Sequence, residues 1–202
     1  MQIGKDKALR LLIVDDSVEA AEAIVSGLRN AGIAVRPTRP ENEDELKELL
    51  DSQTPDLIIA AHASRAVPLA RTMALVVATG KDLPVLVLYD SIDDARLLEA
   101  SAMGARGTIL RDRAAQIEYV VRSEWTDLEA RRALRRLENH VRETERRCDA
   151  LIASSRDPIA YIHDGMHIRA NDAYLEMFGY DSFEDVEGIS LLDMVAPQHV
   201  ES

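Results

Sequence analysis

The chain has 202 residues, in which 36 Asp and Glu outweigh 24 Lys and Arg to give a formal net charge of −12. Hydrophobic residues make up 47% of the chain and there is one cysteine, a composition typical of an ordered protein without a disulfide framework. The acidic excess argues against a nucleic-acid partner, and no apolar run approaches the roughly 18 residues that a membrane span needs. We therefore expect a cytoplasmic protein with no membrane insertion.

The charge is distributed in three zones. Residues 1–112 carry 13 basic and 18 acidic side chains, residues 113–153 carry 9 and 8, and residues 154–202 carry 2 and 10. The net charges are therefore −5, +1 and −8, and they predict three structural units. We place these units at residues 1–122, 113–153 and 154–202, the second continuing the last helix of the first.

In the first zone, short apolar segments alternate with helical patterns. Helices are predicted over 18–31, from Asn42 to Leu50, near 67–78 and over 93–103. The predicted strands are Leu9–Val14, a short strand from Val35, Leu57–Ala61, Val85–Leu88 and Thr108–Leu110. Strands that alternate with helices require right-handed crossovers, and hence a parallel sheet covered on both faces. The sequence therefore predicts a doubly wound α/β domain with five strands.

In such a domain, functional side chains gather where the strands end at their carboxyl edge. The residues that follow or end the predicted strands there are Asp15, Asp16, His62, Tyr89, Asp90 and Arg111. The segments LLIVDDS, PDLIIA, PVLVLYD and GARGTILRD, in this order and spacing, resemble the receiver domain of response regulators over residues 7–122. This resemblance implies a CheY-like sheet with the strand order 2-1-3-4-5.

In the receiver family, an acidic pair holds Mg²⁺, an Asp at the end of the third strand accepts a phosphoryl group, a Thr or Ser ends the fourth strand, and a Lys follows the fifth. Asp15 and Asp16 match the acidic pair, but Ala61 occupies the phosphoacceptor position. Tyr89 replaces the Thr or Ser, and Arg111 replaces the Lys. We therefore expect no catalytic residue, and Mg²⁺ binding at Asp15 and Asp16 that is weak or lost, because Mg²⁺ demands near-octahedral oxygen ligation. Helix capping is an equally weighted role for this pair.

Three neighbouring residues give further hypotheses about this pocket. His62 is the alternative phosphoacceptor, although a structural or solvent-facing role is favoured because it is one residue off register. The ring of Tyr89 is expected to hold the pocket in one conformation, and Arg111 to pair with Asp15 or Asp16 in place of the ion. Together these hypotheses predict a locked scaffold.

The second zone predicts one long helix. Residues 113–153 contain neither Gly nor Pro, and 41 helical residues extend about 60 Å. Ile117, Val121 and Leu128 form a stripe expected to pack on the receiver sheet, out of phase with a later apolar seam. That seam has the a and d spacing of a parallel homodimeric coiled coil, with a solvated single helix as the alternative; its residues are Leu134, Leu137, Val141, Thr144, Cys148 and Leu151.

The third zone predicts two short strands, Ile159–His163 and His167–Ala170, joined by a turn at Asp164-Gly165. Asn171 then caps a helix that Gly179 ends. Residues 149–202 resemble the N-terminal half of a PAS domain, on the motif residues Asn171, Ala173, Gly179 and Tyr180. We expect a partial α+β segment that further residues would complete, and that is loosely packed, domain-swapped or supported by a neighbouring chain. Its ligand is not indicated.

The chain lacks the P-loop, GxGxxG, HExxH and GxSxG motifs. We therefore expect a regulatory module, not an enzyme, with no cofactor and with protein signalling partners. A degenerate receiver followed by a PAS segment resembles the N-terminal half of FimX-type proteins, whose GGDEF and EAL domains act in cyclic-di-GMP signalling and govern type IV pilus assembly and twitching motility. The alternatives are the input module of a hybrid histidine kinase and a phosphoacceptor that uses His62.

Overall fold

The computed structural model describes residues 8–91 and 93–190. The chain divides into two compact units between Ala133 and Leu134. None of the helices in the described ranges has both the length and the apolar character needed to cross a membrane.

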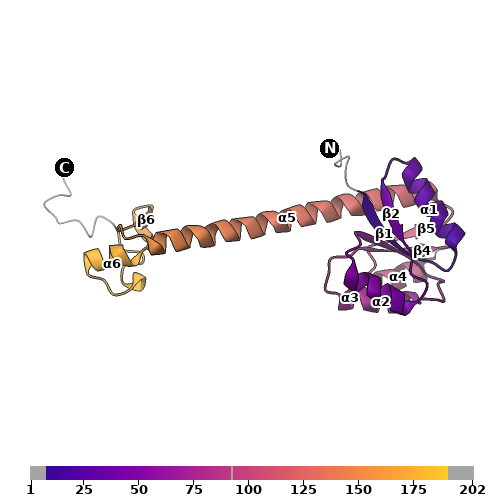
Figure 1. The fold of residues 1–202 in the computed structure, drawn as a ribbon, viewed down its shortest axis with the longest axis horizontal. Coiled ribbons are helices and arrows are strands. Elements are labelled where there is room, and N and C mark those ends of the chain that lie inside the picture. The colour runs from indigo at the N-terminus through magenta and orange to yellow at the C-terminus, as the bar shows by residue number, and fades with distance from the viewer. Residues whose placement is uncertain (1–7, 92, 191–202) are drawn as a thin grey trace. The chain divides into compact units, whose positions relative to one another are not determined.

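The first unit contains a five-stranded parallel sheet in the order β2-β1-β3-β4-β5, which confirms the predicted CheY-like fold (Figure 1). All residues of two of the three inner strands, β3 and β4, are buried, because helices cover both faces of the sheet. The strands are β1 (Leu9–Val14), β2 (Val35–Thr38), β3 (Leu57–Ala61), β4 (Val85–Tyr89) and β5 (Gly107–Leu110).

The first two helices of this unit begin at the predicted caps, Ser17 and Asn42, whereas Asp93, predicted as the first residue of a helix, is itself a cap. Ser17, Asn42 and Asp93 each accept a hydrogen bond from a backbone N–H in the first turn of the next helix. Several boundaries differ from the prediction by one or two residues. The start of α3 is at Leu69 because Pro68 has an extended ψ of 143°. The helices are α1 (Val18–Asn30), α2 (Glu43–Ser52), α3 (Leu69–Ala78) and α4 (Asp94–Ala102). The first part of the long helix α5, which as a whole spans Ala114–Ser154, also belongs to this unit.

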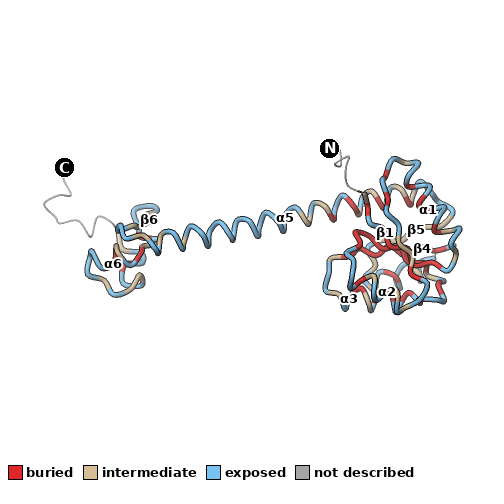
Figure 2. Tube along the Cα trace, viewed as in Figure 1, coloured by how far each residue is buried: buried red, intermediate tan, exposed pale blue. Residues whose placement is uncertain are grey.

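Two apolar cores hold this unit together, one on each face of the sheet. Figure 2 shows buried segments of this unit in red. On one face, α1 and α5 pack on the odd-numbered residues of β1 and β3, such as Ile13 and Ile59. On the other face, α2, α3 and α4 pack on the even-numbered residues, such as Leu12 and Ile58. The alternation follows from the period of two along a strand.

The first part of α5 packs on the sheet along one stripe. Ile117, Val121 and Leu128 are buried, as the helical spacing predicted, and Trp125 joins them. The stripe thus extends past residue 122, where the sequence analysis ended the receiver-like unit. The indole of Trp125 was not singled out in the sequence, although it lies at helical spacing from Val121 and Leu128.

The second unit contains the rest of α5 and a small α+β segment. Its elements are β6 (Ala160–His163), β7 (Met166–Ala170), α6 (Asp172–Phe178) and a short 3₁₀ helix, η1 (Phe183–Asp185). The antiparallel hairpin turns at Asp164 and Gly165, whose φ values of 49° and 80° are those of a type I′ turn. Residues 191–202 of the predicted PAS segment lie outside the described residues.

Asn171 joins the end of α5 to this segment. Its Oδ1 accepts hydrogen bonds from the backbone N–H groups of Ile159 and Tyr174, at 2.8 and 3.0 Å. Its Nδ2 donates to the carbonyl oxygens of Ile152 and Asp157, at 3.2 and 2.9 Å. Because the side chain is only 3% exposed, these bonds are shielded from competing water.

His167 forms a second polar link inside this segment. Its ring is fully buried, with Nδ1 2.8 Å from the carbonyl oxygen of Ile189 and Nε2 2.8 Å from the hydroxyl of Tyr174. The carbonyl can only accept, so Nδ1 carries the proton and Nε2 accepts from the hydroxyl in the neutral ring. Burial raises the pKa of Tyr174, so this hydroxyl keeps its proton.

Candidate functional site

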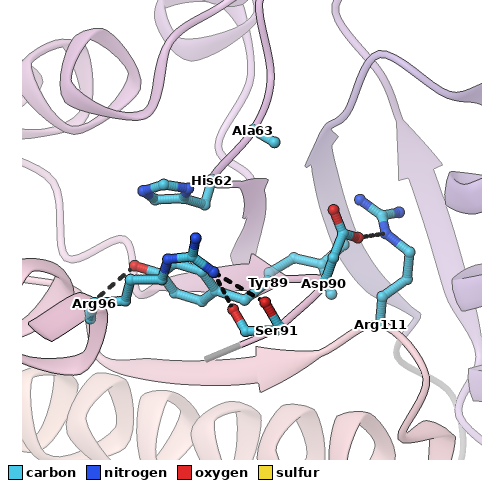
Figure 3. A pocket seen from close by; sticks show the side chains of 8 residues that line it. His62, Ala63, Tyr89, Asp90, Ser91, Arg96 and Arg111 are labelled. Carbon is cyan, nitrogen blue, oxygen red and sulfur yellow. Dashed lines mark hydrogen bonds and ion pairs between the residues drawn. The ribbon is translucent and has the colours of Figure 1, made fainter. Parts of the chain in front are cut away.

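A pocket opens at the carboxyl edge of the sheet, where receiver domains carry their phosphorylation site (Figure 3). Its walls come from the segment that follows β3, from the end of β4 and the residues after it, from the start of α4 and from the residue that follows β5. The lining residues are His62, Ala63, Leu88, Tyr89, Asp90, Ser91, Arg96 and Arg111.

Ala61 occupies the end of β3, level with Leu88 of β4. Its side chain is 3% exposed and belongs to the apolar core beneath α1 and α5. A methyl group offers neither a nucleophile nor a metal ligand. The position at which receiver domains carry the phosphoacceptor is therefore part of the core in this chain.

Arg111 pairs with Asp15, one of the two partners that the sequence analysis allowed. Arg111 Nη1 lies 2.7 Å from Oδ2 of Asp15, and Arg111 Nε lies 2.8 Å from Oδ1 of Asp90. The backbone N–H of Ser17 donates to the other oxygen of Asp15 at 2.9 Å. Burial alone would lower the pKa of Arg111, but hydrogen bonds to Asp90 and Asp15 outweigh it, so the guanidinium remains charged.

Asp16 has a different set of partners, all from the loop between β3 and α3. Its carboxylate accepts hydrogen bonds from the Ser64 hydroxyl at 2.8 Å, the Arg65 N–H at 2.9 Å and the Ala66 N–H at 3.2 Å. These bonds, led by that from Arg65, hold the pKa of Asp16 below its usual range. Asp16 is thus a loop anchor, whereas Ser17 caps α1. The loop partners were not identified from the sequence, because Ser64 has no periodic signal.

Tyr89 closes the inner side of the pocket. The residue is only 2% exposed, and its hydroxyl donates to the carbonyl oxygen of Arg96 in α4 at 3.1 Å. Burial raises the pKa of Tyr89, so the hydroxyl remains a donor. The aromatic ring is therefore held inward by packing and by this bond.

His62 lies over the ring of Tyr89 (Figure 3). The two ring centroids are 4.7 Å apart with an interplanar angle of 27°, and His62 Nε2 lies 3.8 Å from Oε2 of Glu99. The side chain is 32% exposed. Asp90 and Arg111 lie across the pocket from it (Figure 3). His62 thus lines the pocket as a stacked, half-buried ring.

The pocket does not fit the Mg²⁺ ion that receiver domains bind. Mg²⁺ needs several oxygen ligands in octahedral geometry. Here a guanidinium already contacts Asp15, three donors already contact Asp16, and Ala61 supplies no oxygen. In the described part of the chain, no group of three or more His, Cys, Asp or Glu side chains could hold a metal ion.

The second predicted functional feature is the apolar seam of α5. Its six residues are all exposed in the described chain, and they include Leu134 (57% exposed), Leu137 (60%) and Leu151 (72%). Thr144 donates its hydroxyl hydrogen to the carbonyl oxygen of His140 at 2.8 Å. The free thiol of Cys148 is exposed.

Receiver domains are among the solved structures that are similar to this chain. The signal receiver domain of the response regulator NarL from Mycobacterium tuberculosis is 21% identical, with a TM-score of 0.52 over 59% of this chain and 98% of that chain. A response regulator from Chloroflexus aurantiacus J-10-fl is 25% identical, with a TM-score of 0.52; the match covers 59% of this chain and 99% of that chain. A fusion protein that carries the trimeric coiled coil of yeast Spc42 is 22% identical, with a TM-score of 0.54; the match covers 72% of this chain and 97% of that chain.

The PAS domain family matches residues 147–202, which include the end of α5 and the small α+β segment. No curated protein matches the chain in sequence. The receiver-like fold, the long helix and the PAS match together define a signal-transduction regulatory module with a response-regulator-like domain followed by a PAS segment.

Proposed function

We propose that the chain is a non-catalytic, cytoplasmic regulatory module whose receiver-like domain works without phosphorylation and without Mg²⁺. One observation carries this proposal: Asp15 and Asp16, the two acidic residues that the receiver pattern retains, are already engaged by Arg111 and by the β3–α3 loop. In this proposal, the receiver-like unit binds a protein partner, and α5 carries the effect to the PAS segment.

The proposed output is cyclic-di-GMP signalling through GGDEF and EAL domains, as in FimX-type proteins, with control of type IV pili and twitching motility. This part of the proposal rests on the order of the domains, a degenerate receiver followed by PAS, and no residue chemistry of the chain carries it. The module is also proposed to dimerise through α5. The exposed apolar seam supports that step. The input module of a hybrid histidine kinase is the alternative with the same domain order.

A phosphoacceptor role for His62 is the second candidate. Its imidazole lines the same pocket as Arg111, and an imidazole nitrogen can form a phosphoramidate. Against it, the ring stacks on Tyr89 and its Nε2 lies near Glu99, whose negative charge would repel an incoming phosphoryl group.

The test is incubation of residues 1–202 with a small phosphodonor and Mg²⁺, followed by intact-mass measurement. The proposal expects no mass gain of one phosphoryl group. A gain that the His62→Ala variant abolishes would establish the phosphoacceptor role and overturn the proposal. A receiver with all the family residues, treated alongside, shows that the donor is active.

A further inference from the structure

The apolar seam of α5 is open to solvent in the described chain, with Leu134, Leu137 and Leu151 all more than half exposed. A charged helix of this kind gains most of its stability by burying such a stripe. We propose that a second copy of the chain covers the seam, parallel to the first and in register with it. This inference rests on the dimer of the proposed function; it adds the register of the two helices and the physical reasons for their parallel orientation.

The apolar layers favour pairing in register. The a positions are Leu134, Val141 and Cys148, and the d positions are Leu137, Thr144 and Leu151. In a parallel pair in register, each position meets its own copy, so Thr144 meets Thr144 and only one layer is polar. A slip by one heptad sets Thr144 against the partner's Leu137 in one layer and against the partner's Leu151 in another. The slip therefore places a polar side chain against a leucine in two layers, and it removes the apolar contacts at both ends of the seam.

The hydroxyl of Thr144 can enter the seam without leaving a donor unpaired. It already donates to the carbonyl oxygen of His140, one turn earlier in the same helix, at 2.8 Å. A buried hydroxyl without a partner would cost much of what the neighbouring layers gain. The intrahelical bond removes this cost, so Thr144 weakens the seam without blocking it.

Charge on the flanks selects the parallel orientation. Glu138 and Glu145 occupy e positions, and His140 and Arg147 occupy g positions. In a parallel pair, a g residue faces the partner's e residue five positions later, which sets His140 beside the partner's Glu145. In an antiparallel pair, e faces e and g faces g, so two Glu138–Glu145 pairs bring like charges together, whereas no contact between g and e positions in the parallel pair does so. Like charges at these positions destabilise a helix pair.

Cys148 reports the orientation because it is the one cysteine of the chain. In register, the two Cys148 side chains meet in the same a layer. In the antiparallel pairing that overlaps the whole seam, Cys148 faces the partner's Leu137, and the two cysteines lie eleven residues, about 16 Å, apart along the helices. A disulfide requires Cα atoms within about 7 Å, so only the parallel pair can form one.

The experiment is mild oxidation of residues 1–202, read on a non-reducing gel at a concentration where sedimentation velocity gives the oligomeric state. The expected result is a dimer that becomes covalent through Cys148 in most molecules, with no covalent dimer from the Cys148→Ser variant. In a second mixture, wild-type chain and a Leu137→Cys/Cys148→Ser chain are oxidised together. The parallel pair should link like with like, whereas mixed disulfides would show the antiparallel pair.

The remaining outcomes separate this inference from the proposed function. A dimer without the Cys148 disulfide overturns the parallel, in-register pairing and leaves the dimer standing. A trimer overturns the two-stranded seam, and a monomer removes the dimer as well. As a charge test, Glu145→Lys should leave the dimer Kd within about twofold, because the facing His140 carries no formal charge at pH 7, whereas in an antiparallel pair it would meet the partner's Glu138 and lower the Kd. Glu143→Lys, at an exposed c position, is the matched control and should change the Kd less.

Discussion

Arg132 of α5 forms an ion pair with Asp56 just before β3, with Nη1 2.5 Å from Oδ1. The Asp56 side chain is fully buried, and Arg10 of β1 donates to the same carboxylate through its backbone N–H and its guanidinium. One carboxylate thus joins β1, β3 and α5 at the edge of the sheet opposite the pocket. Arg131 adds a second ion pair at this end of the unit, to Asp82 at 3.0 Å.

The Arg132–Asp56 pair should fasten α5 to the sheet. We expect Arg132→Met to lower the free energy of unfolding of the receiver-like unit by about 1–3 kcal/mol, because a charge-assisted hydrogen bond to a buried carboxylate is lost while Arg10 still compensates the charge. Urea unfolding followed by tryptophan fluorescence measures this change, since Trp125 of α5 lies in the apolar core of this unit. The control is Arg136→Met, on an exposed turn of α5. Equal stability of the two variants would contradict the prediction.

Asp56 should also make stability depend on pH. Burial by itself would raise the pKa of Asp56, but hydrogen bonds from Arg10 and Arg132 outweigh it and hold the pKa at about 2. Since this pKa is below the unfolded value of about 3.9, the carboxylate contributes about 2 kcal/mol of stability above pH 4, which is lost as the pH falls toward 2.

Asp56→Asn removes the titrating group, so the difference in unfolding free energy between wild type and this variant should shrink as the pH falls from 6 to about 2. Unfolding of both proteins in urea at several pH values measures it. A difference that stays constant over this range would show that Asp56 has an ordinary pKa.

Arg111 should act as a built-in cation for the acidic pair. The Arg111→Ala variant leaves the buried carboxylate of Asp15 without the guanidinium that compensates its charge. We expect the free energy of unfolding of the receiver-like unit to fall by about 1–3 kcal/mol. Mg²⁺ at millimolar concentration should recover part of this loss, because a divalent cation can then approach Asp15. Thermal unfolding with and without Mg²⁺ tests this, with Arg113→Ala as the control. The same response to Mg²⁺ in the wild type would contradict the assignment.

Asn171 should hold the PAS segment to the end of α5. The Asn171→Ala variant loses the acceptor for the N–H groups of Ile159 and Tyr174 and the donor to the carbonyl oxygens of Ile152 and Asp157. The free energy of unfolding of this segment should fall by at least about 2 kcal/mol. Hydrogen exchange should speed up across β6, β7 and α6 and stay unchanged in the parallel sheet. Asn139→Ala, on an exposed turn of α5, should leave both regions unchanged. Faster exchange in the sheet would show that the two units unfold together.

The sequence by itself determined the secondary structure and the loss of the phosphoacceptor. Local signals are sufficient for these features: apolar strands that turn polar at their ends, caps such as Ser17 and Asn42, and a turn at Asp164-Gly165 that needs positive φ. The strand pattern places Ala61 at the end of β3, and the resemblance to the receiver family identifies that position as the one where the phosphoacceptor would lie.

Only the tertiary structure decided which charges meet. Arg111 was left with a choice between Asp15 and Asp16, and the fold gives it Asp15 because Asp16 is held by the loop after β3. The Arg132–Asp56 pair joins residues 76 positions apart, and no local pattern marks such a contact. Periodicity reports which face of an element is apolar, whereas ion pairs depend on how separate elements pack, and that is determined only when the chain folds.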